Sequence, residues 1–254
     1  FIPLPNQIIM KYLSIFLLGI WSTLALAQDI NQVDAQGRKQ GKWRGYFEES
    51  KRLRYEGQFD QGREVGIFTY YDDTKANTVV ATRDFSKTPG SAYTIFYDTK
   101  KNKVSEGNVI GKQYDGLWTY YHHQSPAVMA TEFYKNGKLE GLRKVFYKNG
   151  KLAEETMYSN GVKNGPYRKI TESGVVLEES NYVAGKFDGP AVFRDGDGQL
   201  VSKGNFKAGA KNGYWEFYKN GKLEKKEKYP IRKPRLMKNA SVSKVAVPGG
   251  ASKP

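Results

Sequence analysis

The chain of 254 residues contains no cysteine. Disulfide bonds, thiol nucleophiles and cysteine-based zinc sites are therefore excluded. Histidine is nearly absent as well, and its two copies, His122 and His123, are adjacent. Because neighbouring residues on a strand point to opposite faces, one metal ion cannot easily bind both, and we interpret them as surface loop residues. The sequence predicts no metal site and no cofactor.

Acidic residues are missing from both ends of the chain. Residues 1–27 hold one basic residue, Lys11, and residues 230–254 hold six, with no acid in either segment. The net charge is +15, of which residues 28–229 contribute +8 from 34 basic and 26 acidic residues. A surplus of this kind favours anionic partners such as acidic polymers or membrane surfaces, and it also serves solubility alone.

Long apolar runs are missing except near the amino terminus. Met10 begins a segment in which Lys11 precedes the apolar run Tyr12–Trp21 and the small-x-small site Ala25-Leu26-Ala27. These parts in this order are typical of a secretory signal peptide. We favour Met10 as the start, with an upstream extension before it, so that residues 1–27 comprise this extension and a signal helix. Cleavage after Ala27 then gives a periplasmic or secreted protein.

Glycines recur along the rest of the chain at intervals of 24 to 26 residues. They are Gly41, Gly66, Gly90, Gly116, Gly141, Gly165, Gly189 and Gly213. A fixed period in this range indicates a repeat architecture. Each unit has two halves that are rich in tyrosine and phenylalanine, which favour strands. We expect an all-β fold, in which about eight antiparallel β-hairpin repeats over residues 41–229 form an elongated, twisted meander sheet.

The segments on either side of the repeats differ from them in composition. Residues 28–40 are polar and are interpreted as a lead-in that caps the array. Residues 230–254 combine proline, glycine, serine and basic residues, which cannot build a core, so we predict a disordered basic tail.

The Asn220-Gly221 dipeptide predicts the pairing of the last hairpin. A type I′ turn at this dipeptide places Lys219 opposite Lys222 and Tyr218 opposite Leu223. Tyr218 and Leu223 then share one face, and Trp215 and Phe217 share the other. Since both faces carry aromatic residues, the sequence leaves open which face is buried.

Two classes of turn are expected in the other units. Short turns inside units are predicted at Asn149-Gly150 and, in weaker copies, at Ser173-Gly174 and Asp197-Gly198. Longer glycine loops are predicted between units, for example from Asn160 to Gly165. The unit near Asp72–Asn77 lacks a clean turn, so a longer loop is expected there.

Three segments, WEFYKNGKL, VFYKNGKLAEETMYSNGVKNG and WTYYHHQSPAVMATEFYKNGKLEG, resemble MORN-type repeats. More narrowly, they are similar to the bacterial variant labelled as the YwqK family of antitoxins. The resemblance covers about residues 41–229. It implies an extended β-hairpin array that serves in binding or scaffolding, and the family label implies neutralisation of a toxin. MORN-type repeats have also been linked to lipid contact, which leaves attachment to a membrane surface as an alternative.

Catalytic constellations are hard to find. The paired carboxylates Glu154-Glu155 and Glu178-Glu179 recur at equivalent positions of two units. Recurrence indicates charge pairing across strands rather than one catalytic dyad. No glycine-rich segment is followed by Lys-Ser or Lys-Thr, and no serine lies in a strand-turn-helix setting. We therefore expect a protein that is not an enzyme.

The leading hypothesis is an exported, non-enzymatic β-repeat protein that binds or scaffolds another macromolecule through its extended sheet. The alternatives are an antitoxin-like or immunity-like protein and a membrane-surface module. The partner is expected to be a protein or an anionic cell-envelope polymer, with no nucleic acid, and the oligomeric state stays open. Candidate surface aromatics, structural or binding, are Trp43, Tyr70, Tyr97, Trp118, Tyr121, Tyr147, Tyr167, Trp215 and Tyr218.

Overall fold

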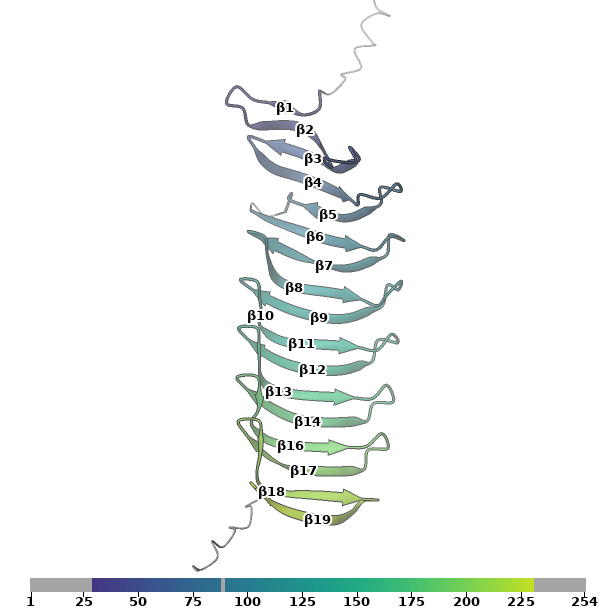
Figure 1. Ribbon diagram of the computed structural model, residues 1–254, viewed down its shortest axis with the longest axis vertical. Helices are drawn as coiled ribbons and strands as arrows, with labels where there is room; N and C mark the ends of the chain where they lie inside the picture. The colour runs from purple at the N-terminus through teal and green to yellow at the C-terminus, as the bar shows by residue number, and fades with distance from the viewer. Residues whose placement is uncertain (1–28, 88–89, 231–254) are drawn as a thin grey trace, which may run out of the picture.

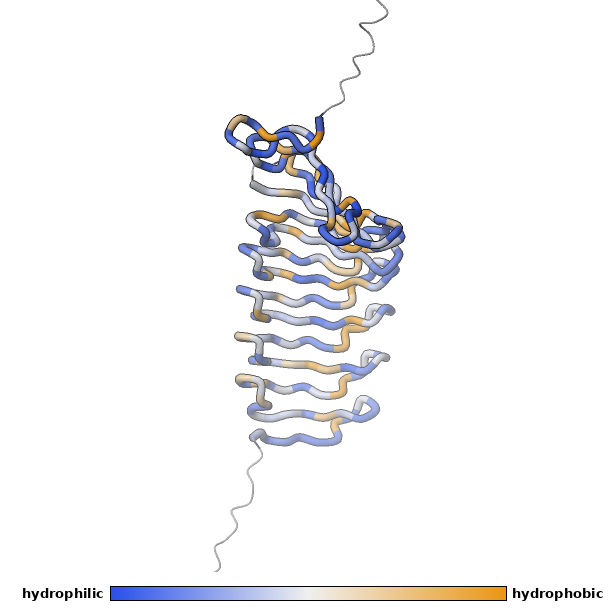
Figure 2. Tube along the Cα trace, turned by 45° about the horizontal axis from the view of Figure 1, so that its top comes forward, coloured by the Kyte–Doolittle hydropathy of each residue, from blue (hydrophilic) through white to orange (hydrophobic). Residues whose placement is uncertain are grey.

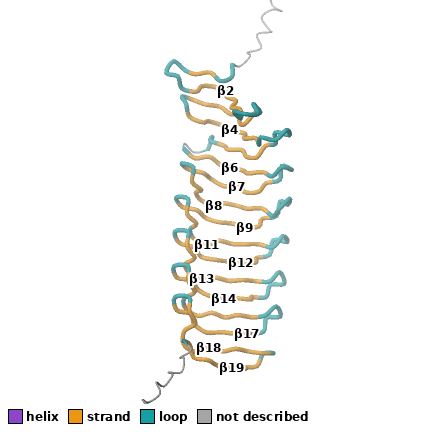
Figure 3. Tube along the Cα trace, in the orientation of Figure 1, coloured by secondary structure: helices purple, strands orange, loops and turns teal. Residues whose placement is uncertain are grey.

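The computed structural model describes residues 29–87 and 90–230. The predicted signal segment and, apart from Pro230, the predicted tail lie outside these residues. All regular structure in the described part is β-strand, with no helix (Figure 3). The all-β prediction is therefore confirmed for this part of the chain.

Nineteen strands form one sheet. They are β1 (Gln32–Val33), β2 (Lys39–Tyr46), β3 (Leu53–Asp60), β4 (Arg63–Tyr71), β5 (Val79–Asp84), β6 (Ser91–Tyr97), β7 (Lys103–Ile110), β8 (Gln113–Tyr121), β9 (Val128–Lys135), β10 (Lys138–Leu139), β11 (Gly141–Phe146), β12 (Leu152–Ser159), β13 (Val162–Ile170), β14 (Val176–Val183), β15 (Lys186–Phe187), β16 (Gly189–Arg194), β17 (Leu200–Lys207), β18 (Ala210–Lys219) and β19 (Lys222–Tyr229).

Apart from β10 with β11 and β15 with β16, strands that follow one another along the chain pair antiparallel, so the sheet is a single-layer meander. The two-residue strands β10 and β15 act as short lead-ins, since β9 pairs with both β10 and β11, and β14 with both β15 and β16. Figure 1 shows the strands stacked like rungs, with β1 at one end of the array and β19 at the other. The predicted elongated meander is confirmed, and hydrophobic residues recur along much of its length (Figure 2).

The two faces of the sheet differ in burial. Phe68, Trp118 and Trp215 have relative exposures of 0%, 0% and 1%, and they lie on the same face. We call this the packed face, and its buried residues are Phe59, Phe68, Ala81, Ala92, Thr94, Ser105, Val109, Trp118, Ala130, Thr156, Tyr167, Ser180, Ala191 and Trp215. Rings from successive strands cover one another, as in the edge contact of Phe206 with Trp215 at 4.9 Å between centroids. The buried face is therefore the face of Trp215, not that of Tyr218.

Glycines inside the strands make this packing possible. A Cβ atom on Gly57, Gly107 or Gly204 would lie within 2.4 to 2.5 Å of the ring of Phe68, Trp118 or Trp215. Each ring thus lies flat over the backbone of the neighbouring strand. Shielding of a strand glycine by a cross-strand aromatic compensates for the missing side chain.

The two classes of turn are reversed relative to the sequence prediction. Asn160 and Gly161, with φ of 51° and 84°, form a tight two-residue turn between units, and the paired strand β13 begins at Val162. The expected long loop from Asn160 to Gly165 is therefore wrong. Asn149-Gly150 lies in a five-residue loop inside a unit, closed by the Tyr147 N–H on the Lys151 carbonyl at 2.8 Å.

The reason is that an Asn-Gly dipeptide fits both kinds of turn. In the longer loop only the glycine needs a positive φ, and the Asn149 side chain accepts the Lys151 N–H at 3.0 Å. Ser173-Gly174 and Asp197-Gly198 lie in loops closed in the same way, from Thr171 to Val175 and from Asp195 to Gln199. The longer loop expected near Asp72–Asn77 is present between β4 and β5.

The last hairpin follows its prediction. Asn220 and Gly221 have φ of 50° and 72°, as a type I′ turn requires. Lys219 pairs with Lys222 and Tyr218 with Leu223. The register shifts between Phe217 and Tyr218, which is a bulge that the sequence argument did not predict.

Hydrogen bonds between turns join neighbouring units. The glycine N–H of a tight turn donates to a carbonyl one unit earlier, as from Gly161 to Leu139, Gly185 to Lys163 and Gly209 to Phe187, each at 2.8 Å. On the opposite side of the array, the Tyr147 hydroxyl donates to the Ile170 carbonyl at 2.8 Å. Both rows of turns are thereby held in register along the array.

The polar lead-in covers part of the first edge. Gln32 and Val33 pair with Gln40 and Lys39 of β2. The Asn31 side chain continues this edge, since its amide oxygen accepts the Arg44 N–H at 2.7 Å and its amide nitrogen donates to the Arg44 carbonyl at 3.1 Å. A side-chain amide thus takes the place of a neighbouring strand.

Candidate binding surface on the open face

The face opposite the packed face, which we call the open face, exposes large apolar side chains. Leu117 is 59% exposed, Phe133 46% and Leu142 39%. Leu117 lies opposite Phe133, and Leu142 lies opposite Met157. The pairing of Lys144 with Thr131 places Leu142 beside Phe133. These four residues form one row across β8, β9, β11 and β12, which we call the central strip.

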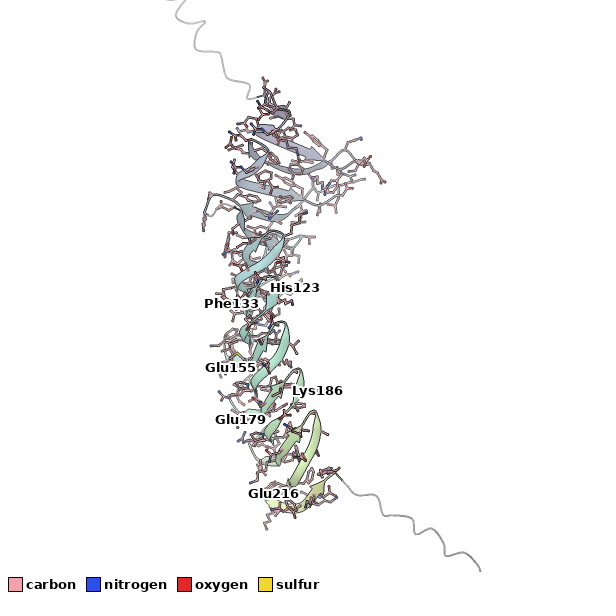
Figure 4. All side chains as sticks on the ribbon, turned by 90° about the vertical axis from the view of Figure 1, so that its left-hand side faces the viewer. His123, Phe133, Glu155, Glu179, Lys186 and Glu216 are labelled. Atoms are coloured by element: carbon pink, nitrogen blue, oxygen red, sulfur yellow. The ribbon has the colours of Figure 1, made fainter. Side chains whose placement is uncertain are left out.

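A row of alternating charges begins beside the β11–β12 half of the central strip, two residues along from Leu142 and Met157, and continues onto β13 and β14. Lys144 pairs with Glu155, Glu155 with Arg168, and Arg168 with Glu179. Nitrogen to oxygen distances to Glu155 are 3.8 Å from Lys144 and 3.7 Å from Arg168. Figure 4 shows Phe133, Glu155 and Glu179 following one another along the same side of the array.

The paired glutamates separate onto opposite faces. Glu155 and Glu179 belong to the charge row on the open face, whereas Glu154 lies on the packed face. There Glu154 accepts hydrogen bonds from Thr156 at 3.0 Å and Tyr167 at 3.2 Å. Because adjacent carboxylates on a strand point apart, neither pair brings two carboxylates to one substrate. The pairing across strands agrees with the interpretation drawn from their recurrence.

The packed face also holds a charged triad. Arg143 lies 2.7 Å from a carboxylate oxygen of Glu132 and 3.2 Å from one of Glu154. Desolvation lowers the pKa of Arg143, but the hydrogen bond to Glu132 and the negative charges of Glu132 and Glu154 together outweigh it, so the pKa lies above its usual value. The Tyr134 hydroxyl donates to Glu132 at 2.6 Å, and burial together with this hydrogen bond raises the pKa of Tyr134 to about 12. These groups satisfy one another within the sheet.

The candidate aromatics divide into three groups. Trp118, Tyr167 and Trp215 are buried on the packed face, with Trp43 and Tyr70 half-buried there, so these residues mainly pack the sheet. Tyr97, Tyr121 and Tyr218 are half-buried on the open face, and Tyr147 lies in a loop. Tyr121 donates to Glu106, and burial with this hydrogen bond raises its pKa.

The most exposed apolar side chains of the open face are not among the candidate aromatics. Ile67 is 63% exposed, Leu117 59% and Tyr214 58%. Each of them directly follows a unit glycine, Gly66, Gly116 or Gly213. The sequence does contain a signal for these residues. Each is an apolar residue between the unit glycine and the buried aromatic, and because side chains alternate between the faces of a strand, it must lie on the face opposite that aromatic.

The two histidines lie in the loop between β8 and β9. His122 is half-buried, and its Nε2 donates to the carbonyl of Phe146 at 3.0 Å, whereas His123 is exposed. Within residues 29–87 and 90–230, no group of three or more His, Asp or Glu residues is arranged to hold a metal ion. Over the same residues, no helix has the length and apolarity to span a membrane.

One family model matches the chain. Residues 139–160 match a MORN repeat variant, and they comprise the end of β10, all of β11 and β12, and the loop between them. The matched segment is one hairpin unit of the array, and the match supports a MORN-type repeat protein. No curated protein matches the chain.

Proposed function

We propose that this chain is a non-enzymatic scaffold that binds a partner protein through the central strip of its open face. The observation that carries the proposal is the row of exposed Leu117, Phe133 and Leu142, at 59%, 46% and 39%. Contiguous exposed apolar side chains at the middle of a surface favour contact with another protein.

The surroundings of the strip suit such a contact. The neighbouring charges are already paired with one another, as Glu155 is with Lys144 and Arg168. A partner therefore does not need to neutralise them, and they form a polar border on one side of the apolar strip. Strands on both sides of the strip hold its residues at fixed spacing, so little side-chain and backbone order is lost on binding.

Location and mode of action complete the proposal. The signal segment that the sequence predicts before Gln28 would place the scaffold outside the cytoplasm. The narrower function implied by resemblance to the YwqK antitoxins, neutralisation of a toxin, would use the same strip. A toxin-like gene beside this one, together with restored growth on co-expression, would support it, and growth arrest that co-expression leaves unchanged would contradict it.

Affinity capture from the source cell envelope tests the strip directly. The chain from residue 28 to 254 is compared with Leu142→Glu, which places a charge in the strip, and with Val183→Glu as the matched control. Val183 is an apolar open-face residue that is 50% exposed and lies next to a turn. We expect the unchanged chain and Val183→Glu to capture the same partner protein. Leu142→Glu should capture at least tenfold less of it, because the substitution removes the binding free energy of about one well-packed side-chain contact.

Two outcomes would contradict the proposal. Recovery of the same proteins by Leu142→Glu would show that the strip is not the contact. Sedimentation velocity that finds a dimer lost only in Leu142→Glu would show that a second copy of this chain, rather than a different protein, covers the strip.

A further inference from the structure

The open face carries the same depression twice. The first, of about 500 Å³, lies over Gly57 and is lined by Lys42, Arg44, Glu56, Gln58, Ile67 and Thr69. The second, of about 270 Å³, lies over Gly204 and is lined by Pro190, Val192, Lys203, Asn205, Tyr214 and Glu216. These two sets occupy equivalent positions of their units, whereas Ile30 of the lead-in lines the first depression alone.

Sheet register explains why the two depressions match. Lys42 pairs with Gln58 just as Pro190 pairs with Asn205. The register shifts on either side of Gly57 and of Gly204, which is a bulge in both units. Because Gly57 and Gly204 direct their Cβ positions to the packed face, backbone forms the floor on the open face, and the side chains around it form the walls.

The two depressions also share their chemistry. Each has an exposed wall, Ile67 at 63% or Tyr214 at 58%. Each has a side-chain amide, Gln58 or Asn205, beside the glycine. Each has a cation and a carboxylate in contact, since Arg44 to Glu56 and Lys203 to Glu216 are both 3.2 Å. Amides and charged pairs bind hydroxyl groups, and a flat apolar wall covers the face of a ring.

Positive charge gathers around the second depression. Lys226 and Lys228 place their Nζ atoms 5.4 Å and 5.6 Å from the ring centroid of Tyr214. Lys228 pairs with Tyr214 across the open face, whereas Lys203 and Lys226 already contact Glu216. Lys228 therefore favours an anion at this end of the face.

We infer that the two depressions bind a carboxylate-bearing polysaccharide, with a sugar ring against Tyr214, hydroxyl groups on Asn205 and a carboxylate on Lys228. The inference rests on the proposed function only in that it uses the same open face, and it does not involve the central strip. The scaffold would then hold a glycan and a protein at once.

The spacing of the depressions favours a polymer over a short sugar. Gly57 on β3 and Gly204 on β17 are twelve strand spacings apart along the array, about 58 Å at about 4.8 Å each. A long chain that enters one depression raises its effective concentration at the other, so a polymer binds more tightly than a fragment.

Calorimetric titration of the full chain tests the inference. The probes are polygalacturonate, trigalacturonate, neutral dextran and polyphosphate. We expect polygalacturonate to bind more tightly than trigalacturonate and polyphosphate, and dextran not to bind. Tyr214→Ala should weaken polygalacturonate binding about tenfold, because the ring wall is lost. Tyr46→Ala, at another open-face tyrosine that is 50% exposed, should leave binding unchanged.

Other results would overturn the inference. If polyphosphate binds as tightly as polygalacturonate and Tyr214→Ala has no effect, the polymer is held only by the positive charge of the protein. No polygalacturonate binding at low salt would exclude the site. Far-UV circular dichroism of both variants confirms that the sheet is intact. Leu142→Glu should bind polygalacturonate normally, so failure here and failure of the proposed protein contact are separate results.

Discussion

Three strand glycines, Gly57, Gly107 and Gly204, allow large aromatic rings to pack on one face of the sheet. On the packed face, each takes the ring of Phe68, Trp118 or Trp215 at a distance that no Cβ atom would allow. On the open face, the bare backbone of Gly57 and Gly204 forms the floor of a depression. The missing side chain therefore serves the packing of the sheet, and the open-face floor exists because these positions direct their side chains to the packed face.

Substitution of one such glycine should be costly. In Gly107→Ala the new Cβ would meet the Trp118 ring at 2.5 Å, and Trp118 is fully buried. We expect the free energy of unfolding to fall by about 1–3 kcal/mol, as for other overpacked sites. Urea unfolding followed by tryptophan fluorescence measures the change.

Gly196→Ala is the matched control for this substitution. A Cβ at Gly196 has no neighbour within 4 Å. This variant should be as stable as the unchanged chain or slightly more stable, because alanine restricts the unfolded state. Equal effects of Gly107→Ala and Gly196→Ala would contradict the packing of Trp118 against Gly107.

The β18–β19 hairpin has its own electrostatic support. The Glu216 carboxylate accepts hydrogen bonds from the Tyr218 hydroxyl at 2.7 Å and from Lys226 at 3.0 Å, and Lys203 lies 3.2 Å away. These contacts, that of Tyr218 first, lower the pKa of Glu216 from 4.5 to about 2. Like charges at Lys219 and Lys222 face each other across the same turn, so this pairing offsets some of their repulsion.

Acid should therefore weaken this hairpin. Because the folded-state pKa of Glu216 lies below its unfolded value, its contribution to stability is complete above pH 4.5 and is lost as the pH falls towards about 2. An NMR titration of the Glu216 carboxyl carbon should have a midpoint near pH 2, and Lys226→Ala should raise it. A midpoint near 4.5 in the unchanged chain would show that the contacts do not form in solution.

Much of the element order was predictable from the sequence. The spacing of the glycines predicted the division into repeat units, and the tyrosine and phenylalanine residues predicted the positions of the strands. Both predictions succeed because they depend only on residues close together in the sequence. The classes of turn were assigned wrongly because Asn149-Gly150 and Asn160-Gly161 share a dipeptide, and only pairing with neighbouring strands separates them.

Burial and the candidate sites were harder to predict. Trp215 and Tyr218 both suit a buried face, and which one is buried depends on whether a glycine on the next strand, Gly204, can accept its ring. The central strip depends in the same way on which residues of β9 and β11 come together. Such contacts between strands leave no mark in the spacing of a single segment.

At the level of the whole molecule, the two faces of the single sheet layer have different roles: one face packs its own side chains, and the other carries the proposed binding surfaces. Thr156, Ser180 and the large rings fill the packed face, and within the described residues no buried side-chain nitrogen or oxygen lacks a hydrogen-bond partner. The open face is left with the central strip, the charge row and the two depressions. Each unit contacts mainly its neighbours, so every added unit lengthens the array and enlarges its open face.

The distance between two spin labels along the array tests this architecture most directly. The chain has no cysteine, so Asn108→Cys and Asn205→Cys give two unique labelling sites. Both residues are exposed at equivalent open-face positions on β7 and β17, eight strand spacings apart. Double electron–electron resonance should give a narrow distribution near about 38 Å. A broad distribution, or a narrow one centred well away from about 38 Å, would contradict the one-layer array.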